Sequence, residues 1–165
     1  MIILNGNNVT ELNQFIEAVR RDPTRADRNP KLTAHWVGGS RSRVECDDKV
    51  MYIGGDDELN AMRVLLAALA ACDVDVIATH ASLMGLEIET LSVEVGGRFN
   101  VCAYLGLPEA PGSGYDGVAY TIHARIPGAT LEQLAELRRR VEYGSPVGNS
   151  LARAIPLKMN FDAHV

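Results

Sequence analysis

The chain has 165 residues, with 16 Lys and Arg against 21 Asp and Glu, so its formal net charge is −5. Hydrophobic residues make up 47% and charged residues 22% of the sequence, values typical of a globular protein and not of a disordered chain. The acidic balance, without a long basic run, argues against nucleic acid as the main partner. The length is sufficient for a sizeable hydrophobic core.

The cysteine content indicates a reducing compartment. Three cysteines are present, Cys46, Cys72 and Cys102, and they form neither a C-x-x-C pair nor a Cys/His cluster with zinc spacing. A disulfide-stapled secreted domain is therefore not predicted. The start of the chain, MIILNGNN, lacks the basic region and the long apolar region of a signal peptide. We expect a cytoplasmic protein, in which a reactive cysteine would be catalytic or a sensor.

The first predicted element is a helix over residues 8–21. Asn8 and Glu11 have the spacing of a capping box, and the apolar residues that follow recur at helical spacing. The charged segment after this helix contains two prolines and is interpreted as a linker. We therefore expect residues 1–30 to be an appendage and residues 31–165 to form the main domain.

Three short strands are predicted next, over residues 32–37, 42–46 and 49–53. Apolar and polar side chains alternate in these segments, and Gly or Asp residues separate them. The pair Asp47-Asp48 gives the second and third strands the spacing of a hairpin.

The most informative stretch is residues 60–84, which predicts a buried central helix that ends at Gly85. Its core, VLLAALAACDVDVIATHA, is rich in Ala and Leu and apolar on nearly every side. Four titratable residues interrupt this run: Arg63, Asp73, Asp75 and His80. Their polarity argues against a membrane-spanning helix. Because a helix that is apolar all round needs cover on every side, we expect an intimate homodimer.

The rest of the chain completes an α+β pattern. Alternation predicts four strands, the second weaker than the others, over residues 86–95, 99–105, 117–126 and 155–161. Thr130 and Gln133 form a capping box that opens a helix, and residues 138–140, all Arg, are expected in its last turn. A short segment, residues 145–152, precedes the last strand. Strands grouped around a buried helix predict an antiparallel α+β domain and not a βαβ sheet.

Cys72, inside the central helix, is the main candidate for chemistry. It is either a small buried hydrophobe or a nucleophile, and the second role requires a lowered thiol pKa. Its helical neighbours supply no cation, and Asp75 would raise the thiol pKa if it faced the sulfur. A cation would have to come from a partner subunit or from the preceding strands, which carry Arg41, Arg43 and Lys49.

The other candidates favour structural roles. Cys46 and Cys102 have acidic or apolar surroundings. The four histidines are scattered without metal-ligand spacing, so no metal site is predicted. Gly54-Gly55 and Gly112-Ser113-Gly114 lack the strand and helix context of a dinucleotide-binding loop, so they are interpreted as turns and no cofactor is predicted.

Three segments of the chain resemble, in the expected order, the motifs of one family: AHWVGG, LLAALAACDVDVIATHASLMGLEIETLSVEV and SPVGNSLARAIPLKMNF. The chain resembles the OsmC/Ohr family of osmotically inducible and organic hydroperoxide resistance proteins over residues 32–161. This resemblance implies an OsmC-like fold, in which antiparallel sheets wrap around two long central helices in an intertwined homodimer. The N-terminal helix is extra to the usual pattern.

The resemblance also implies a thiol chemistry. In the family, a peroxidatic cysteine attacks an organic hydroperoxide, a second cysteine forms a disulfide with it, and a dithiol reductant restores both. The peroxidatic position falls on Cys72, and the resolving position falls on Ser145, which cannot form a disulfide. The family's glutamate position falls on Arg63. Its activating arginine falls near Met51, where the nearest cations are Lys49, Arg43 and Arg41.

Two functions are therefore predicted as alternatives. The first is an OsmC-like oxidoreductase of the oxidative stress response, a thiol-dependent peroxidase with Cys72 as its one nucleophile and Arg63 as a thiolate partner in a rearranged site. The second is a non-catalytic relative that binds a small apolar ligand at the dimer interface. Retention of Cys72 favours the first, and Ser145 and Arg63 favour the second. A purely structural dimer module is a third, weaker alternative.

Overall fold

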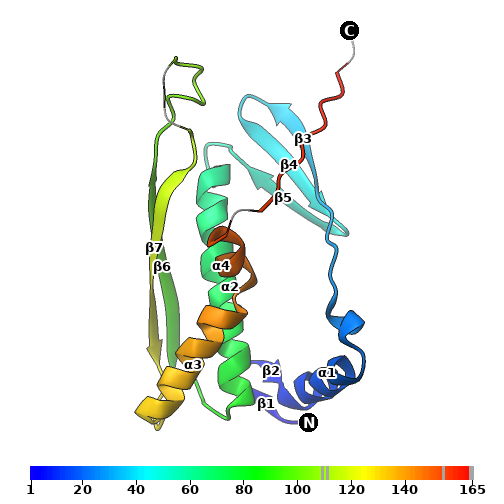
Figure 1. Cartoon of the computed structure of the whole chain (residues 1–165), viewed down its shortest axis with the longest axis vertical. Coiled ribbons are helices and arrows are strands. Elements are labelled where there is room, and N and C mark those ends of the chain that lie inside the picture. Colours follow the sequence, from blue (N-terminus) through cyan, green and yellow to red (C-terminus); the bar gives the residue numbers. More distant parts are fainter. Residues whose placement is uncertain (109, 111, 154, 164–165) are drawn as a thin grey trace.

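The computed structural model describes residues 1–108, 110, 112–153 and 155–163. The elements are arranged around one long helix, α2 (Ala61–Leu83), which runs through the middle of the molecule (Figure 1). The strands pair only in antiparallel sheets within these residues, and the helices lie outside the sheets. The α+β class predicted from the sequence is confirmed.

The ends of α2 agree with the predicted limits. The Asn60 side chain accepts a hydrogen bond from the Arg63 backbone N–H at 2.9 Å, which satisfies a donor of the first turn. At the other end Gly85 has a φ of 70°, and the Leu86 N–H donates to the Ala81 carbonyl at 2.8 Å. This left-handed glycine ends the helix. In the described part of the chain, no helix is both long enough and apolar enough to span a membrane.

A long antiparallel hairpin covers one side of α2. Its strands, β6 (Thr90–Phe99) and β7 (Tyr115–Arg125), pair along nearly their whole length and lie beside α2 in Figure 1. Helix α3 (Leu131–Gly144) packs against the same helix and begins with the predicted Thr130–Gln133 capping box. Five buried apolar side chains form the core where these elements meet: Ile77, Ala81, Leu86, Leu137 and Val141.

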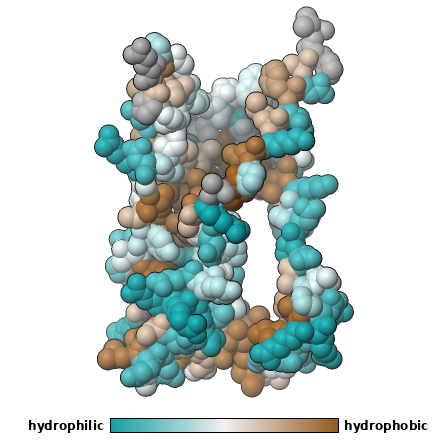
Figure 2. Space-filling model, viewed as in Figure 1, coloured by the Kyte–Doolittle hydropathy of each residue, from teal (hydrophilic) through white to brown (hydrophobic). Residues whose placement is uncertain are grey.

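The first three predicted strands form a sheet of their own. They pair in sequence order: β3 (Thr33–Gly38), β4 (Arg41–Cys46) and β5 (Lys49–Ile53). Cys46 pairs with Lys49, which confirms the hairpin around Asp47-Asp48. The main packing partners of α2 are β6, α3 and the short helix α4 (Pro146–Leu151). The space-filling view shows an opening between the α2 side of the molecule and the segment that leads into the β3 sheet (Figure 2).

The N-terminal segment contains the predicted helix and a small hairpin that was not predicted. Strands β1 (Ile3–Leu4) and β2 (Asn7–Asn8) pair with each other before α1 (Val9–Arg21) begins. The Asn8 side chain accepts from the Glu11 N–H at 3.3 Å, as expected for the N-cap. A single 3₁₀ turn, η1 (Pro23–Ala26), follows α1 within the predicted linker.

Asn5, at the tip of the hairpin, connects it to the end of α2. Its side-chain nitrogen donates to the Leu86 carbonyl at 2.9 Å and to the Ser82 hydroxyl at 3.2 Å. Its side-chain oxygen accepts from the Ile88 N–H at 2.9 Å. Asn5 has a φ of 49°, a left-handed conformation that Asn tolerates better than most residues. The division of the chain into an appendage and a main domain stays a prediction.

Two of the predicted strands are wrong. Residues 101–107 form turns and not a strand, with the Leu105 N–H bonded to the Val101 carbonyl at 3.0 Å. Strand β6 instead continues through Gly96-Gly97 to Phe99. The predicted closing strand over residues 155–161 is extended and exposed, and no strand is assigned among its residues. Its alternation marks an extended segment, but a strand also needs a hydrogen-bonding partner.

The arginine run 138–140 does not lie in the last turn of α3. The helix continues to Gly144, so these side chains lie on its middle turns. There they pair along the helix: Arg138 with Glu142 at 2.8 Å, and both Arg139 and Arg140 with Glu136 at 2.7 Å. Ion pairs with glutamates one turn away explain these three arginines, so no interaction with the helix dipole is needed.

We predict that Asn5→Ala lowers the free energy of unfolding by about 2–3 kcal/mol, because it removes several hydrogen bonds and forces Ala into a left-handed conformation. Asn5→Gly removes the same hydrogen bonds but accepts the backbone conformation, so it should cost roughly 1 kcal/mol less. Urea unfolding of the three proteins measures both differences. Equal midpoints for the wild type and Asn5→Ala would show that the hairpin is not held by this side chain.

Candidate functional site

The structure brings together Cys72 and Ser145, the two residues that the resemblance places at the peroxidatic and resolving positions. Cys72 lies in the middle of α2 and is half-buried, and Ser145 is the buried residue that joins α3 to α4. The Cys72 sulfur lies 3.7 Å from the Ser145 hydroxyl oxygen. Among the residues that the structure describes, Ser145 is the only side-chain hydrogen-bond partner of this sulfur.

Ser145 is held in place because it is the N-cap of α4. The Gly148 N–H donates to its hydroxyl oxygen at 3.0 Å, and Pro146 occupies the first position of the helix. A side chain far from Cys72 in the sequence is thereby fixed at a defined position against α2. The S-P-V-G pattern explains this local geometry, because a serine before a proline is a common helix start.

Asp73, the residue after Cys72 in α2, contacts Ser145. Its exposed fraction is 0%, and the Ser145 hydroxyl donates to its Oδ1 at 2.5 Å. Its other carboxylate oxygen, Oδ2, is buried and has no hydrogen-bond partner among the described residues. Burying a carboxylate with so few partners costs free energy. A contribution of Asp73 to the stability of the fold therefore does not explain why it occupies this position.

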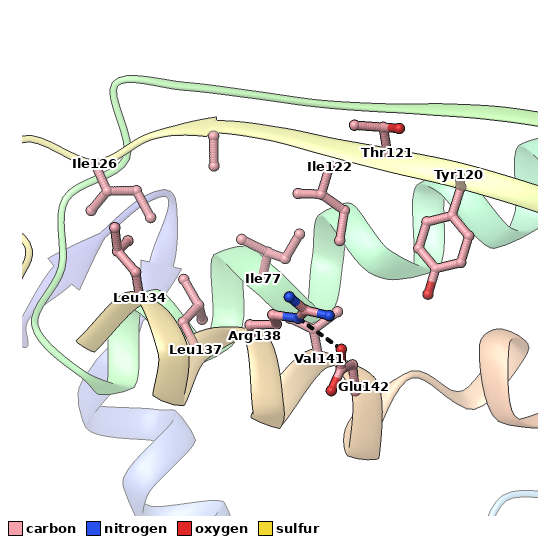
Figure 3. Close-up of a pocket in the computed structure, with 11 residues that line it drawn as sticks. Ile77, Tyr120, Thr121, Ile122, Ile126, Leu134, Leu137, Arg138, Val141 and Glu142 are labelled. Atoms are coloured by element: carbon pink, nitrogen blue, oxygen red, sulfur yellow. Dashed lines mark hydrogen bonds and ion pairs between the residues drawn. The ribbon is translucent and has the colours of Figure 1, made fainter. Parts of the chain in front are cut away.

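Tyr120 of β7 faces the same carboxylate. The pKa of Tyr120 is raised, first because the phenol is partly buried and then because the negative charge of Asp73 disfavours a second anion. In Figure 3 the Tyr120 ring points from the strand toward the helices. We call Cys72, Asp73, Tyr120 and Ser145 the polar cluster.

Two members of the polar cluster were missed by the sequence analysis. Asp73 was noted only as a charge that interrupts an apolar run, and Tyr120 was not singled out. A signal for Asp73 is its register, because it occupies one position of a buried stripe that advances by four residues: Leu69, Asp73, Ile77 and Ala81. A charged residue within such a stripe is either paired or functional.

Arg63 lies apart from Cys72 within one chain. It is an exposed residue in the first turn of α2, roughly 13 Å along the helix axis from Cys72 and on the opposite side of the helix. The three cations of the β3 sheet that were considered each have an acidic partner: Arg41 with Glu58, Arg43 with Glu45 and Lys49 with Asp48. Arg63 as a thiolate partner stays a prediction that needs a second subunit.

Two pockets adjoin the polar cluster. One, of about 580 Å³, lies between α2, β7 and α4, and Ser145 and Tyr120 line it. The other, of about 530 Å³, lies between β7, α2 and α3 (Figure 3). Seven aliphatic side chains line this second pocket: Ile77, Ile122, Ala124, Ile126, Leu134, Leu137 and Val141. Both volumes are in the range of small-molecule sites.

The described residues contain no group of three His, Cys, Asp or Glu side chains that could hold a metal ion. His80 lies farther along α2, and its Nδ1 is buried without a hydrogen-bond partner in this part of the structure. Burial lowers the pKa of His80, and the charge of Arg140 lowers it further, while Glu136 acts in the opposite direction.

His80 makes the stability of the protein sensitive to acid. Its pKa is lower in the folded than in the unfolded chain, so the unfolded chain binds a proton first as the pH falls through about 6.5. Stability should therefore decline below neutral pH, and His80→Gln should decline less over the same interval. Urea unfolding at pH 7.5, 6.0 and 5.0 compares the two proteins. Parallel losses in both would rule out this contribution.

Comparison with known proteins identifies the fold. The family model of OsmC-like protein matches residues 54–160. No curated protein matches the chain. An OsmC-like protein from Mycoplasma pneumoniae is 18% identical, with a TM-score of 0.65 over 76% of this chain and 89% of that one.

Two other solved structures show the same fold. An OsmC-like protein of unknown function from Vibrio cholerae is 12% identical, with a TM-score of 0.59 over 75% of this chain and 94% of that one. An organic hydroperoxide resistance protein from Legionella pneumophila is 21% identical, with a TM-score of 0.52 over 76% and 90% of the two chains. The OsmC-like α+β fold implied by the sequence resemblance is confirmed, while its intertwined homodimer stays a prediction, and the chain belongs to the family of OsmC-like proteins.

Proposed function

We propose that this protein is a thiol-dependent oxidoreductase that reduces organic hydroperoxides, with Cys72 as its single nucleophile. The observation that supports this most directly is the 3.7 Å approach of the Cys72 sulfur to Ser145, the residue at the resolving position. Cys72 is half-buried, and its neighbour Ser145 lines a pocket of about 580 Å³. Some of the structures that share the fold are organic hydroperoxide resistance proteins.

The proposed reaction uses a hydroperoxide and an external dithiol. The Cys72 thiolate attacks the terminal oxygen of R–O–OH, so that an S–O bond forms as the O–O bond breaks, and an alcohol leaves after its alkoxide takes a proton. Ser145 cannot resolve the sulfenic acid. One thiol of the reductant therefore attacks the Cys72 sulfur and releases water, and its second thiol displaces Cys72 and leaves as a disulfide.

We propose that the active form is a homodimer in the cytoplasm. Leu65 and Val74 on α2 are 38% and 37% exposed in one chain, and Trp36 on the β3 sheet is 76% exposed. The segment after α4 also exposes Leu157, Met159 and Phe161. Apolar surface on three separate elements fits an intertwined partner. In such a dimer, Arg63 of one subunit would reach Cys72 of the other.

We predict that the protein consumes cumene hydroperoxide with dihydrolipoamide as reductant, and that Cys72→Ser reduces the rate to that of buffer. The oxygen of serine is a far weaker nucleophile at neutral pH than a thiolate. Cys46→Ser and Cys102→Ser are the matched controls and should retain the wild-type rate. Equal turnover in the wild type and Cys72→Ser would contradict the assignment.

We also predict that Ser145→Cys creates a pair that forms a disulfide with Cys72 after one equivalent of hydroperoxide. The two side chains already approach to 3.7 Å, and a disulfide requires a sulfur–sulfur distance of about 2.05 Å, so a small rotation suffices. Mass spectrometry of an unreduced digest detects the linked peptides. A Ser145→Cys protein in which Cys72 oxidises without this link would show that position 145 is not a resolving position.

The apolar pocket between β7, α2 and α3 favours a second candidate function, the binding of a small apolar ligand. Its walls are mostly aliphatic, and the Arg138–Glu142 ion pair also lines it (Figure 3). The hydroperoxide assay separates the two functions. If neither the wild type nor Cys72→Ser shows turnover, the redox function is wrong, and native mass spectrometry of the purified protein tests for a retained apolar molecule.

A further inference from the structure

We propose that Asp73 is the proton acceptor for the Cys72 thiol and that Ser145 passes the proton between them. This inference rests on the proposed function, because it explains how Cys72 becomes a nucleophile through residues of its own chain, in which Arg63 lies apart from it. Ser145 and Asp73 then act as positioning and proton-transfer residues.

The direction of the hydrogen bonds follows from counting donors. A serine hydroxyl has one proton and two lone pairs, and an ionised carboxylate has no proton to donate. The Ser145 proton therefore points to Asp73 Oδ1, at 2.5 Å. The Gly148 N–H occupies one lone pair of the hydroxyl oxygen, at 3.0 Å. The remaining lone pair accepts from the Cys72 S–H, at 3.7 Å.

This arrangement is a continuous path from thiol to carboxylate. The S–H proton moves to the Ser145 oxygen while the Ser145 proton moves to Asp73, which leaves a thiolate, a neutral serine and a carboxylic acid. The thiolate then attacks the hydroperoxide, and the departing alkoxide takes the stored proton back through Ser145. Cys72 ends as a sulfenic acid and Asp73 as a carboxylate, so protons and electrons balance.

The surroundings of Asp73 suit a proton acceptor. The carboxylate is fully buried, and no ion pair of the described residues includes it. The titratable group that faces it is Tyr120 from β7, and the charge of Glu142 on α3 raises the pKa of Tyr120 in the same direction as Asp73 does. His80 lies on α2 itself, and the described residues of α4 and the inward positions of β6 carry no titratable side chain.

A purely electrostatic role for Asp73 predicts the opposite effect. A carboxylate near a thiol repels the thiolate, so removing its charge would increase thiolate formation. In the proposed proton relay from Cys72 through Ser145 to Asp73, by contrast, the proton stays within the polar cluster. The thiolate population is then independent of pH until Asp73 exchanges a proton with solvent. The two roles therefore differ in the pH profile of Cys72 reactivity.

The test measures alkylation of Cys72 by iodoacetamide in the full chain with Cys46→Ser and Cys102→Ser. We expect a nearly flat rate between about pH 5.5 and pH 7.5 in this protein. With Asp73→Asn added, the rate should climb about tenfold per pH unit and fall about tenfold or more below the parent at the acid end. A flat profile in Asp73→Asn, or faster alkylation at every pH, would overturn the relay.

Ser145 supplies a second, independent comparison. Ser145→Ala should show the same steep profile as Asp73→Asn, and Ser145→Thr, which keeps the hydroxyl, should restore the flat one. Circular dichroism of each variant checks the fold. If Asp73→Asn does not fold, the comparison of Ser145→Ala with Ser145→Thr tests the relay alone. A flat profile in Ser145→Ala would also overturn the proposal.

The alkylation test is separate from the peroxidase test because no hydroperoxide is present. A flat parent profile with steep variants supports the relay even if turnover is absent, in which case the redox function alone fails. Turnover that depends on Cys72, with a steep parent profile, leaves the function standing and overturns the relay.

Discussion

The packing of the α2 stripe is the interaction on which the rest of the structure depends. Leu69, Ile77 and Ala81 are buried between the β6–β7 hairpin, α3 and α4, and the helix has little polar surface with which to face water. Because hydrophobic burial is the dominant stabilising term in folding, the other elements are arranged to cover this helix. Figure 1 shows the outcome, with the hairpin on one side of α2 and with α3 and α4 packed along another.

The polar cluster is an interruption of that apolar packing. Asp73 takes a position that a leucine would fill at lower cost, and it is accommodated because Ser145 reaches it from the start of α4. The same hydroxyl therefore caps a helix, binds a buried carboxylate and meets the Cys72 sulfur. A residue that makes three such contacts has little freedom to move, which keeps the sulfur and the carboxylate at fixed positions.

Much of the fold was predictable because its signals are local. The Thr130–Gln133 capping box, the end of α2 at Gly85 and the hairpin at Asp47-Asp48 each depend on a few neighbouring residues. The errors occurred where the structure depends on contacts between segments that are distant in sequence. Residues 155–161 alternate like a strand but pair with nothing in the described chain, and the docking of the β1–β2 hairpin depends on Asn5 meeting the distant end of α2.

The central helix, the α+β class, the family resemblance and Cys72 as the candidate nucleophile could all be predicted from the amino-acid sequence. These depend on periodicity and motifs, which are properties of adjacent residues. The three-dimensional packing was needed to show that Ser145 lies against Cys72, that the buried Asp73 contacts Ser145 and that Arg63 lies apart from them within one chain. Such contacts join residues that are distant in sequence, and the packing of α4 on α2 creates them.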